Sequence, residues 1–155
     1  MTGSPEPARD GPAPGVPLLI GRKEYLDFPE WHLRRVRVKV DTGAWTSALD
    51  VAGYELCHTA GGLVAHLRLA LDRRHPERLT EVQVPVLRMA VVRNTGGTTE
   101  ERPLLETVIH LGTVCKRIRL TVTDRSHMRY RMILGRQALA GSFVVDVSRK
   151  YLARV

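Results

Sequence analysis

The chain has 155 residues, of which 43% are hydrophobic but only 5% aromatic, so a single domain with a mainly aliphatic core is expected. Its formal net charge of +8 favours anionic partners. However, the basic residues are scattered and few aromatic side chains could stack on bases, which disfavours nucleic acid. The sequence has no long apolar run, no secretory signal and only two cysteines, Cys57 and Cys115, which excludes a membrane helix and predicts a cytoplasmic location.

The first predicted feature in chain order is a flexible tail over residues 1–16, rich in proline, glycine and alanine. A single folded domain is predicted over residues 17–155. Within it, residues 35–40 alternate strictly between cationic residues and valine, which predicts a strand with one buried face that ends at Asp41.

The middle of the domain is predicted to consist of further strands. Residues 63–71 alternate with leucine or alanine on one side and run into a turn at residues 72–76. Residues 81–92 and 102–111 are two more extended runs. The asparagine and glycines between them predict a hairpin tip at residues 93–98.

The last third continues in the same way. A strand is predicted over residues 115–122, one short helix over 135–140 with Gly141 placed to end it, and a final strand over 143–147. Many short strands with one short helix indicate an all-β fold, either a small barrel or a sandwich.

The motif with the most chemical content is Asp41-Thr42-Gly43-Ala44. An aspartate directly after a buried strand is costly unless it is paired, hydrogen-bonded or functional. Gly43 allows a sharp turn that could hold the carboxylate rigidly as a general base. The tripeptide alone is also compatible with an ordinary turn at a strand end, because aspartate and glycine are common in turns.

A second motif far downstream, Met132-Ile133-Leu134-Gly135-Arg136, changes this balance. Together with the Asp-Thr-Gly motif and the hairpin between them, it resembles the retropepsin-like aspartic peptidases. The resemblance implies a closed barrel in which Gly135 and Arg136 open a helix that supports the active-site loop. The hairpin tip with Asn94, Gly96 and Gly97 stands where that family has its flap.

Further runs at residues 39–49, 102–112 and 120–139 are similar to one bacterial branch, the RimK-associated retropepsin-like endopeptidases once labelled ATP-dependent zinc proteases. This resemblance covers residues 18–152. The branch usually has arginine directly after Asp-Thr-Gly-Ala, whereas Trp45 stands there in this chain. In retropepsins the helix arginine pairs with an acid just after the loop. Here that place holds Trp45 or Thr46, which leaves the partner of Arg136 open.

The resemblance implies specific roles for these residues. Asp41, Thr42 and Gly43 would be catalytic, while Ala44 and Trp45 would contact substrate together with the hairpin residues Asn94, Gly96 and Gly97. Because the chain has a single Asp-Thr-Gly motif, two copies of Asp41 would have to meet in a homodimer. Relatives accompany ATP-grasp ligases that add glutamates to proteins, so an acidic or glutamate-rich peptide is the expected substrate.

Other chemistries have weaker support. No His-Glu-x-x-His motif is present, and the adjacent pair Cys57-His58 lacks a matching second pair, so neither a metal nor another cofactor is predicted. Ser47 and Ser126 have no recognisable histidine and aspartate partners. Two alternatives to an active peptidase stay open. One is a catalytically silent module that binds acidic tails or a ligase, motivated by Trp45 and the basic surface. The other is a nucleic-acid-binding or ribosome-associated barrel, which rests on charge alone.

Overall fold

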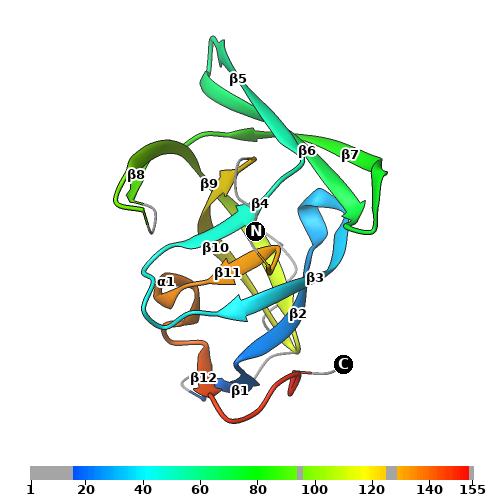
Figure 1. The fold of residues 1–155 in the computed structure, drawn as a ribbon, viewed down its shortest axis with the longest axis vertical. Helices are drawn as coiled ribbons and strands as arrows, with labels where there is room; N and C mark the ends of the chain where they lie inside the picture. Colours follow the sequence, from blue (N-terminus) through cyan, green and yellow to red (C-terminus); the bar gives the residue numbers. More distant parts are fainter. Residues whose placement is uncertain (1–15, 94–95, 125–128, 154–155) are drawn as a thin grey trace, which may run out of the picture.

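The computed structural model describes residues 16–93, 96–124 and 129–153, which form a β-rich domain (Figure 1). The predicted tail lies, except for Val16, outside the described residues. None of the helices in the described ranges is long and apolar enough to span a membrane. In chain order the elements are β1 (Leu18–Gly21), β2 (Lys23–Phe28), the 3-10 turn η2 (Pro29–Trp31), β3 (Leu33–Val40), β4 (Ser47–Asp50), β5 (Gly53–Thr59), β6 (Gly62–Asp72), β7 (His75–Pro85), β8 (Arg88–Arg93), β9 (Thr99–Leu111), β10 (Val114–Thr123), β11 (Met132–Leu134), α1 (Arg136–Leu139) and β12 (Phe143–Asp146).

Six strands close into a barrel in the order β10-β4-β11-β3-β2-β9, because β9 also pairs with β10. β8 adds to β9 as a hairpin outside the ring. Two of the pairings in the ring are parallel, β3 with β11 and β4 with β10. The all-β closed barrel with a short C-terminal helix is therefore confirmed. Gly141 follows α1 with φ of 78°, a left-handed conformation that ends the helix as predicted.

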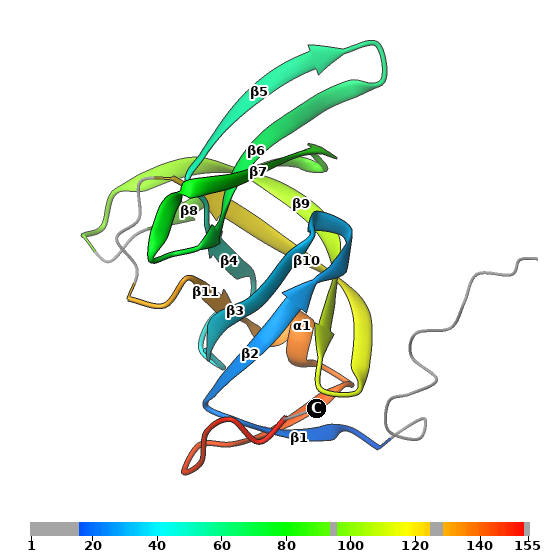
Figure 2. The same cartoon turned by 90° about the vertical axis from the view of Figure 1, so that its right-hand side faces the viewer.

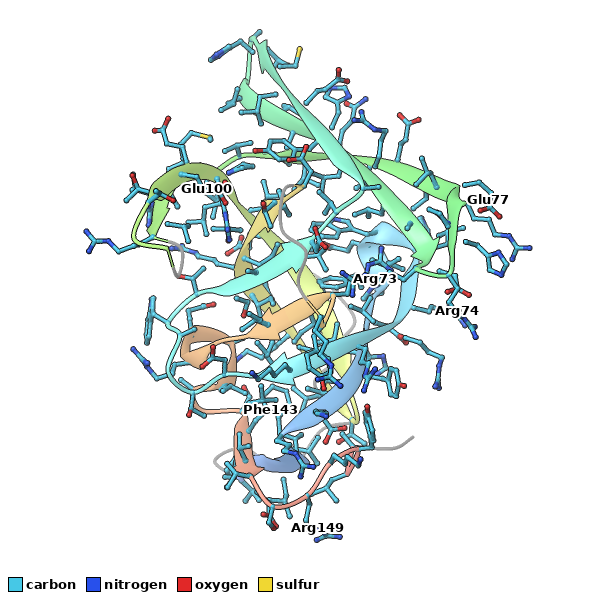
Figure 3. All side chains as sticks on the ribbon, viewed as in Figure 1. Arg73, Arg74, Glu77, Glu100, Phe143 and Arg149 are labelled. Atoms are coloured by element: carbon cyan, nitrogen blue, oxygen red, sulfur yellow. The ribbon has the colours of Figure 1, made fainter. Side chains whose placement is uncertain are left out.

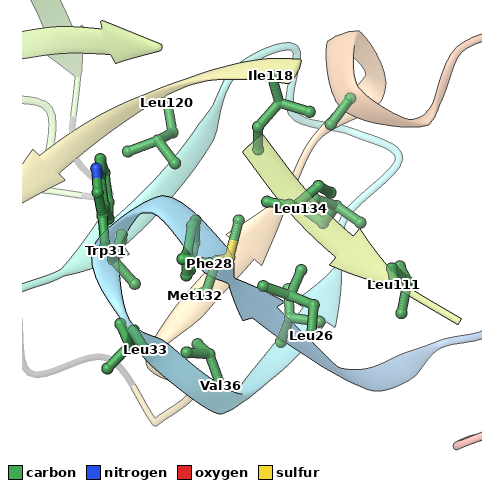
Figure 4. Close-up of a cluster of buried hydrophobic side chains, with 14 of the residues drawn as sticks. Leu26, Phe28, Trp31, Leu33, Val36, Leu111, Ile118, Leu120, Met132 and Leu134 are labelled. Carbon is green, nitrogen blue, oxygen red and sulfur yellow. The ribbon is translucent and has the colours of Figure 1, made fainter. Parts of the chain in front are cut away.

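The inward faces of the barrel strands form a core that is mostly aliphatic (Figure 4). Val36, Val38 and Val40 of β3 all point inward, as their alternation predicts. Phe28 and Trp31 add an aromatic stack, with ring centroids 5.1 Å apart. Since burial of one such side chain contributes about 1.5–3 kcal/mol, the core fixes the ends of the strands firmly.

A separate three-stranded antiparallel sheet, β5-β6-β7, stands on one end of the barrel (Figure 2). The sequence predicts β6 and part of β7 but not that they form a sheet of their own. The run over residues 81–92, predicted as one extended segment, is in fact divided. β7 ends at Pro85 in this small sheet, and β8 begins at Arg88 beside the barrel.

The predicted alternation in β6 holds for only part of the strand. Ala65, Leu67 and Leu69 are buried, but Leu71 is 44% exposed. A register shift between Ala70 and Asp72 explains the difference, because a β-bulge moves the following side chain to the opposite face.

The opposite end of the barrel carries the parallel pair β1 and β12. The buried carboxylate of Glu24 accepts backbone N–H groups from Gly21 at 2.6 Å, Leu152 at 2.9 Å and Ala153 at 3.2 Å. These bonds satisfy the buried charge and join the C-terminal segment to β2.

Candidate active site

The loop over residues 41–46, called here the Asp41 loop, begins where β3 and β11 end together. Val40 pairs with Leu134 in parallel register, and the Asp41 N–H donates to the Leu134 carbonyl at 2.9 Å. Asp41 is half-buried, whereas Thr42 and Gly43 are exposed. The strand pairing therefore places the Asp41 carboxylate at the rim of the barrel, next to the exposed residues Thr42 and Gly43.

The loop itself fixes the Asp41 side chain. Oδ1 accepts the Gly43 N–H at 2.9 Å, and the Asp41 carbonyl accepts the Ala44 N–H at 3.2 Å. An aspartate that bonds to the backbone two residues ahead forms a compact turn of defined shape. The orientation of the carboxylate is therefore set by backbone donors.

The start of α1 packs against the same loop. The Arg136 and Gln137 N–H groups donate to the carbonyls of Ala44 and Trp45 at 2.8 and 2.9 Å. Helix N-terminal N–H groups have no partners within their own helix, so these carbonyls satisfy them. A Cβ atom on Gly135 would come within 2.9 Å of the Ala44 and Thr46 carbonyl oxygens, so only glycine allows this approach.

The side chain of Arg136 crosses to the tip of the loop. Its Nη1 donates to the Thr42 carbonyl at 2.9 Å, and its guanidinium lies 5.7 Å from the centre of the Trp45 ring. These contacts supply the partner that the sequence left open. A backbone carbonyl and an aromatic ring stand where the retropepsin pattern has an acid. Trp45 itself is 58% exposed, so its other surface is free to contact a ligand.

The hairpin residues predicted to contact substrate lie between β8 and β9. Arg93 pairs with Thr99, and Gly96 and Gly97 lie exposed in the turn between them. Asn94 lies outside the described residues. The hairpin and the Asp41 loop lie on the same side of the barrel in both ribbon views (Figures 1 and 2).

The other aspartates considered from the sequence have different surroundings. Asp50 forms an ion pair with Arg73 at 3.0 Å. Asp146 accepts the N–H and hydroxyl of Ser148, and these hydrogen bonds lower the pKa of its carboxyl group. Asp124 is exposed after β10.

Ser47 is a supporting residue that sequence reasoning missed, because it was weighed only as a nucleophile. Its side chain is fully buried, and its Oγ accepts the Gly135 N–H at 3.0 Å. Its position at the start of an apolar segment was the one available signal. In the described ranges, no three histidine, cysteine, aspartate or glutamate side chains gather in a way that could hold a metal ion.

These features define the class of protein. A closed barrel with an Asp-Thr-Gly loop at its rim, supported from behind by a Gly-Arg helix, is the architecture of a retropepsin-like domain. A family model described as RimB-like, retropepsin-like aspartic endopeptidase RimB, matches residues 19–155. The chain therefore belongs to this family.

Curated relatives are longer proteins. Probable alpha-L-glutamate ligases from Desulfotalea psychrophila and Parasynechococcus marenigrum are 29% and 31% identical to this chain over 131 residues, which is 83% of this chain but 28% of each relative. One from Shewanella pealeana is 27% identical over 134 residues, which is 86% of this chain and 29% of the relative. The chain thus spans less than a third of the length of these relatives.

A solved structure shares the fold. Protein Lpg0085 of unknown function from Legionella pneumophila superposes with a TM-score of 0.70, covering 90% of this chain and 100% of its own. At 18% identity this similarity concerns the fold alone.

Proposed function

We propose that this protein is an aspartic endopeptidase that hydrolyses peptide bonds with the carboxyl groups of two Asp41 residues, one from each subunit of a homodimer. The observation that carries the proposal is the placement of Asp41. Its carboxylate is fixed by the Gly43 N–H at the rim of the barrel, and its loop is held from behind by Gly135 and Arg136. Membership of a family described as aspartic endopeptidases supports the same reading.

The dimer is proposed because the chemistry needs a second carboxyl group. The chain has one Asp-Thr-Gly motif, and Asp50 and Asp146 are engaged elsewhere. Thr42 and Gly43 are exposed at the tip of the loop, where they are accessible to the same loop of a second copy. A two-fold axis beside this tip would bring the two Asp41 side chains together.

In this arrangement the two carboxyl groups share one proton, because two like charges so close cannot both ionise. The ionised group takes a proton from a water molecule, whose oxygen attacks the scissile carbonyl carbon. The protonated group gives its proton to the carbonyl oxygen. Collapse of the tetrahedral intermediate then breaks the C–N bond. The amine leaves with the proton that was taken from water, and one hydroxyl of the intermediate returns its proton to the second carboxylate, which restores the shared proton of the pair.

The substrate is proposed to be a peptide or protein rich in acidic residues, since the chain carries a net charge of +8. The β8–β9 hairpin would close over it and exclude water. Because relatives with a matching segment are named probable alpha-L-glutamate ligases, we propose that the chain acts alongside a ligase of the ATP-grasp type. The free thiols of Cys57 and Cys115 fit a reducing cytoplasm.

The test uses Asp41→Asn, with Asp124→Asn as a matched control outside the loop. Peptide products are measured by mass spectrometry on an acidic substrate. We expect Asp41→Asn to lower kcat by at least about a hundredfold, because a general acid and base is lost, and the control to keep full activity. Equal activity of Asp41→Asn and the native chain would overturn the proposal.

A mixing experiment tests the shared dyad. Excess Asp41→Asn protein added to the native chain would form mixed dimers with one carboxyl group and suppress activity. If each subunit acts alone, activity would be unchanged. Sedimentation velocity on the same samples reports whether dimers form.

A second function, peptide binding without cleavage, is favoured by one observation. Trp45 replaces the arginine that is usual in this branch, and the guanidinium of Arg136 lies over the Trp45 ring. This alternative predicts binding of acidic peptides by the native chain with no products at any pH. Appearance of cleaved peptide that depends on Asp41 would exclude it.

A further inference from the structure

A hollow of about 790 Å³ lies on the outside of the barrel, near the start of β3. Seven arginines line it, but only one carboxylate, that of Asp72. The arginines come from three separate segments, and we call this site the arginine pocket. Arg34, Arg35 and Arg37 belong to β3, Arg73 and Arg74 to the turn between β6 and β7 (Figure 3), and Arg129 and Arg131 to the segment before β11.

Most of this positive charge is not neutralised by neighbouring carboxylates. Arg73 pairs with Asp50, and Arg74 pairs with Asp72. Within the part of the chain that the structure describes, the other five arginines form no ion pair. Such a concentration of like charge is unfavourable in the free protein, so it favours binding of an anion with several negative groups.

Arg131 adds a buried cation to the pocket. Only 7% of the residue is exposed, and its Nη2 donates to the carbonyl of Ala70. Burial and the nearby charge of Arg73 lower the pKa of its guanidinium group. The charges of Asp50 and Asp72 act in the opposite direction, but these carboxylates form their ion pairs with Arg73 and Arg74. A buried guanidinium is normally paired directly with an anion, and a bound carboxylate would supply that partner.

The backbone at the start of β3 turns two consecutive arginines toward the pocket. Arg35 has φ of 53°, which is rare for a residue with a side chain, and its N–H donates to Asp27 Oδ1 at 2.8 Å. Arg34 and Arg35 are therefore both exposed, although adjacent residues of a regular strand point to opposite faces. Strain of this kind is found most often at functional sites.

Tyrosine rings contact two of the pocket arginines, and the ring faces are covered by these contacts. The guanidinium of Arg35 lies 4.5 Å from the centre of the Tyr25 ring, which stacks on Tyr151 at 5.1 Å. Arg37 lies 4.8 Å from the centre of the Tyr130 ring. Because these ring faces are occupied, they are not open for nucleic-acid bases to stack on. The pocket therefore suits carboxylates better than RNA.

The spacing of the cations fits an extended peptide. Arg35, Arg37 and Lys39 occupy alternate exposed positions of β3, about 6.6 Å apart, and an extended peptide presents its side chains at the same interval. The row points toward Asp41, four residues beyond Arg37, or about 13 Å along the strand.

We propose that the arginine pocket binds an acidic segment of a peptide in extended conformation, at a site separate from the Asp41 loop. The claim that this peptide is also the substrate rests on the proposed peptidase function, and the binding itself does not. In a substrate, the acidic segment would lie about four to six residues from the scissile bond, by the length of β3 between the pocket and Asp41.

Binding is tested in the Asp41→Asn background, so that cleavage cannot interfere. The probe is a fluorescent peptide of about eight glutamates, long enough to follow the cationic row at ~3.3 Å per residue, and anisotropy reports its affinity. The double variant Arg34→Gln with Arg129→Gln removes two exposed pocket charges that form no ion pair among the described residues. The matched control, Arg78→Gln with Arg149→Gln, removes two exposed charges outside the pocket.

We expect the pocket variant to bind at least about tenfold more weakly, because two charge-assisted contacts are lost, and the control to change affinity less than about twofold. Equal losses in both variants would overturn the proposal in favour of non-specific attraction. Tighter binding of inorganic tripolyphosphate or of an RNA oligonucleotide than of the glutamate peptide would also overturn it. If the peptide binds as expected but the native chain does not cleave it, the binding pocket is supported and the peptidase function is not.

Discussion

The Asp41 loop and the arginine pocket are built in different ways. The loop is held by backbone hydrogen bonds from β11 and α1, and the side chains of Asp41, Ser47 and Arg136 bond to backbone groups around it. The pocket gathers charged side chains from three segments and leaves much of their charge unneutralised. From this difference we expect that the loop contributes to stability while it positions the proposed catalytic carboxyl group, whereas the pocket lowers stability unless an anion is bound. The predictions below test this difference.

The largest effect is expected at Gly135. In Gly135→Ala the new Cβ atom would approach two backbone oxygens at 2.9 Å, so the loop and α1 must separate. Overpacking of this kind lowers the free energy of unfolding by about 1–3 kcal/mol. Urea denaturation measures the loss, and the loss should not depend on salt. Gly61→Ala is the control, because its Cβ would have its nearest contact at 3.9 Å.

Ser47→Ala should come next. The variant leaves the buried Gly135 N–H without its acceptor, which costs about 1–2 kcal/mol in the free energy of unfolding. Ser148→Ala, which removes an exposed hydroxyl from Asp146, serves as the comparison and should change stability much less. If both serine variants unfold at the same urea concentration, the Ser47 bond does not hold the loop.

The two regions also differ in how far the sequence predicts them. The Asp41 loop follows an alternating strand and contains a short motif, so local pattern was sufficient to locate it. The helix at Gly135 was predicted for the same reason. The pocket could not be predicted, because Arg34, Arg73 and Arg129 come together only through the fold.

Errors in the predicted strands have similar causes. The sequence does not predict β1, β2, β4, β5 and β11, which are short or lack regular alternation. The bulge after Ala70 reverses the expected face of Leu71, and no sequence period signals it. The separate β5-β6-β7 sheet depends on which strands pair, which is decided by long-range packing. Local patterns therefore predict strands far better than they predict sheets.

Trp45→Arg restores the residue that is usual in this branch and tests whether the Trp45 ring stabilises the Asp41 loop. It removes the ring that faces the Arg136 guanidinium and places a second cation beside it. We expect a loss of about 0.5–1 kcal/mol in the free energy of unfolding, the usual size of an exposed cation–π contact. Trp45→Phe keeps a ring and should lose less. The view that the ring stabilises the Asp41 loop would be wrong if Trp45→Arg is as stable as the native chain.

The smallest effect, and the one with the opposite sign, is expected in the pocket. Arg34→Gln with Arg129→Gln relieves repulsion among the pocket arginines, so Tm should rise by about one degree at low salt. The gain should disappear above about 0.5 M salt, where the Debye length falls well below 10 Å. Arg78→Gln with Arg149→Gln should show a smaller change in Tm, because these two arginines do not line the pocket.

Added glutamate peptide should raise the Tm of the native chain more than that of the pocket variant, since a ligand that binds only the folded state raises Tm according to its affinity. A drop in Tm at low salt on removing Arg34 and Arg129 would mean that the pocket, like the Asp41 loop, serves to hold the fold together.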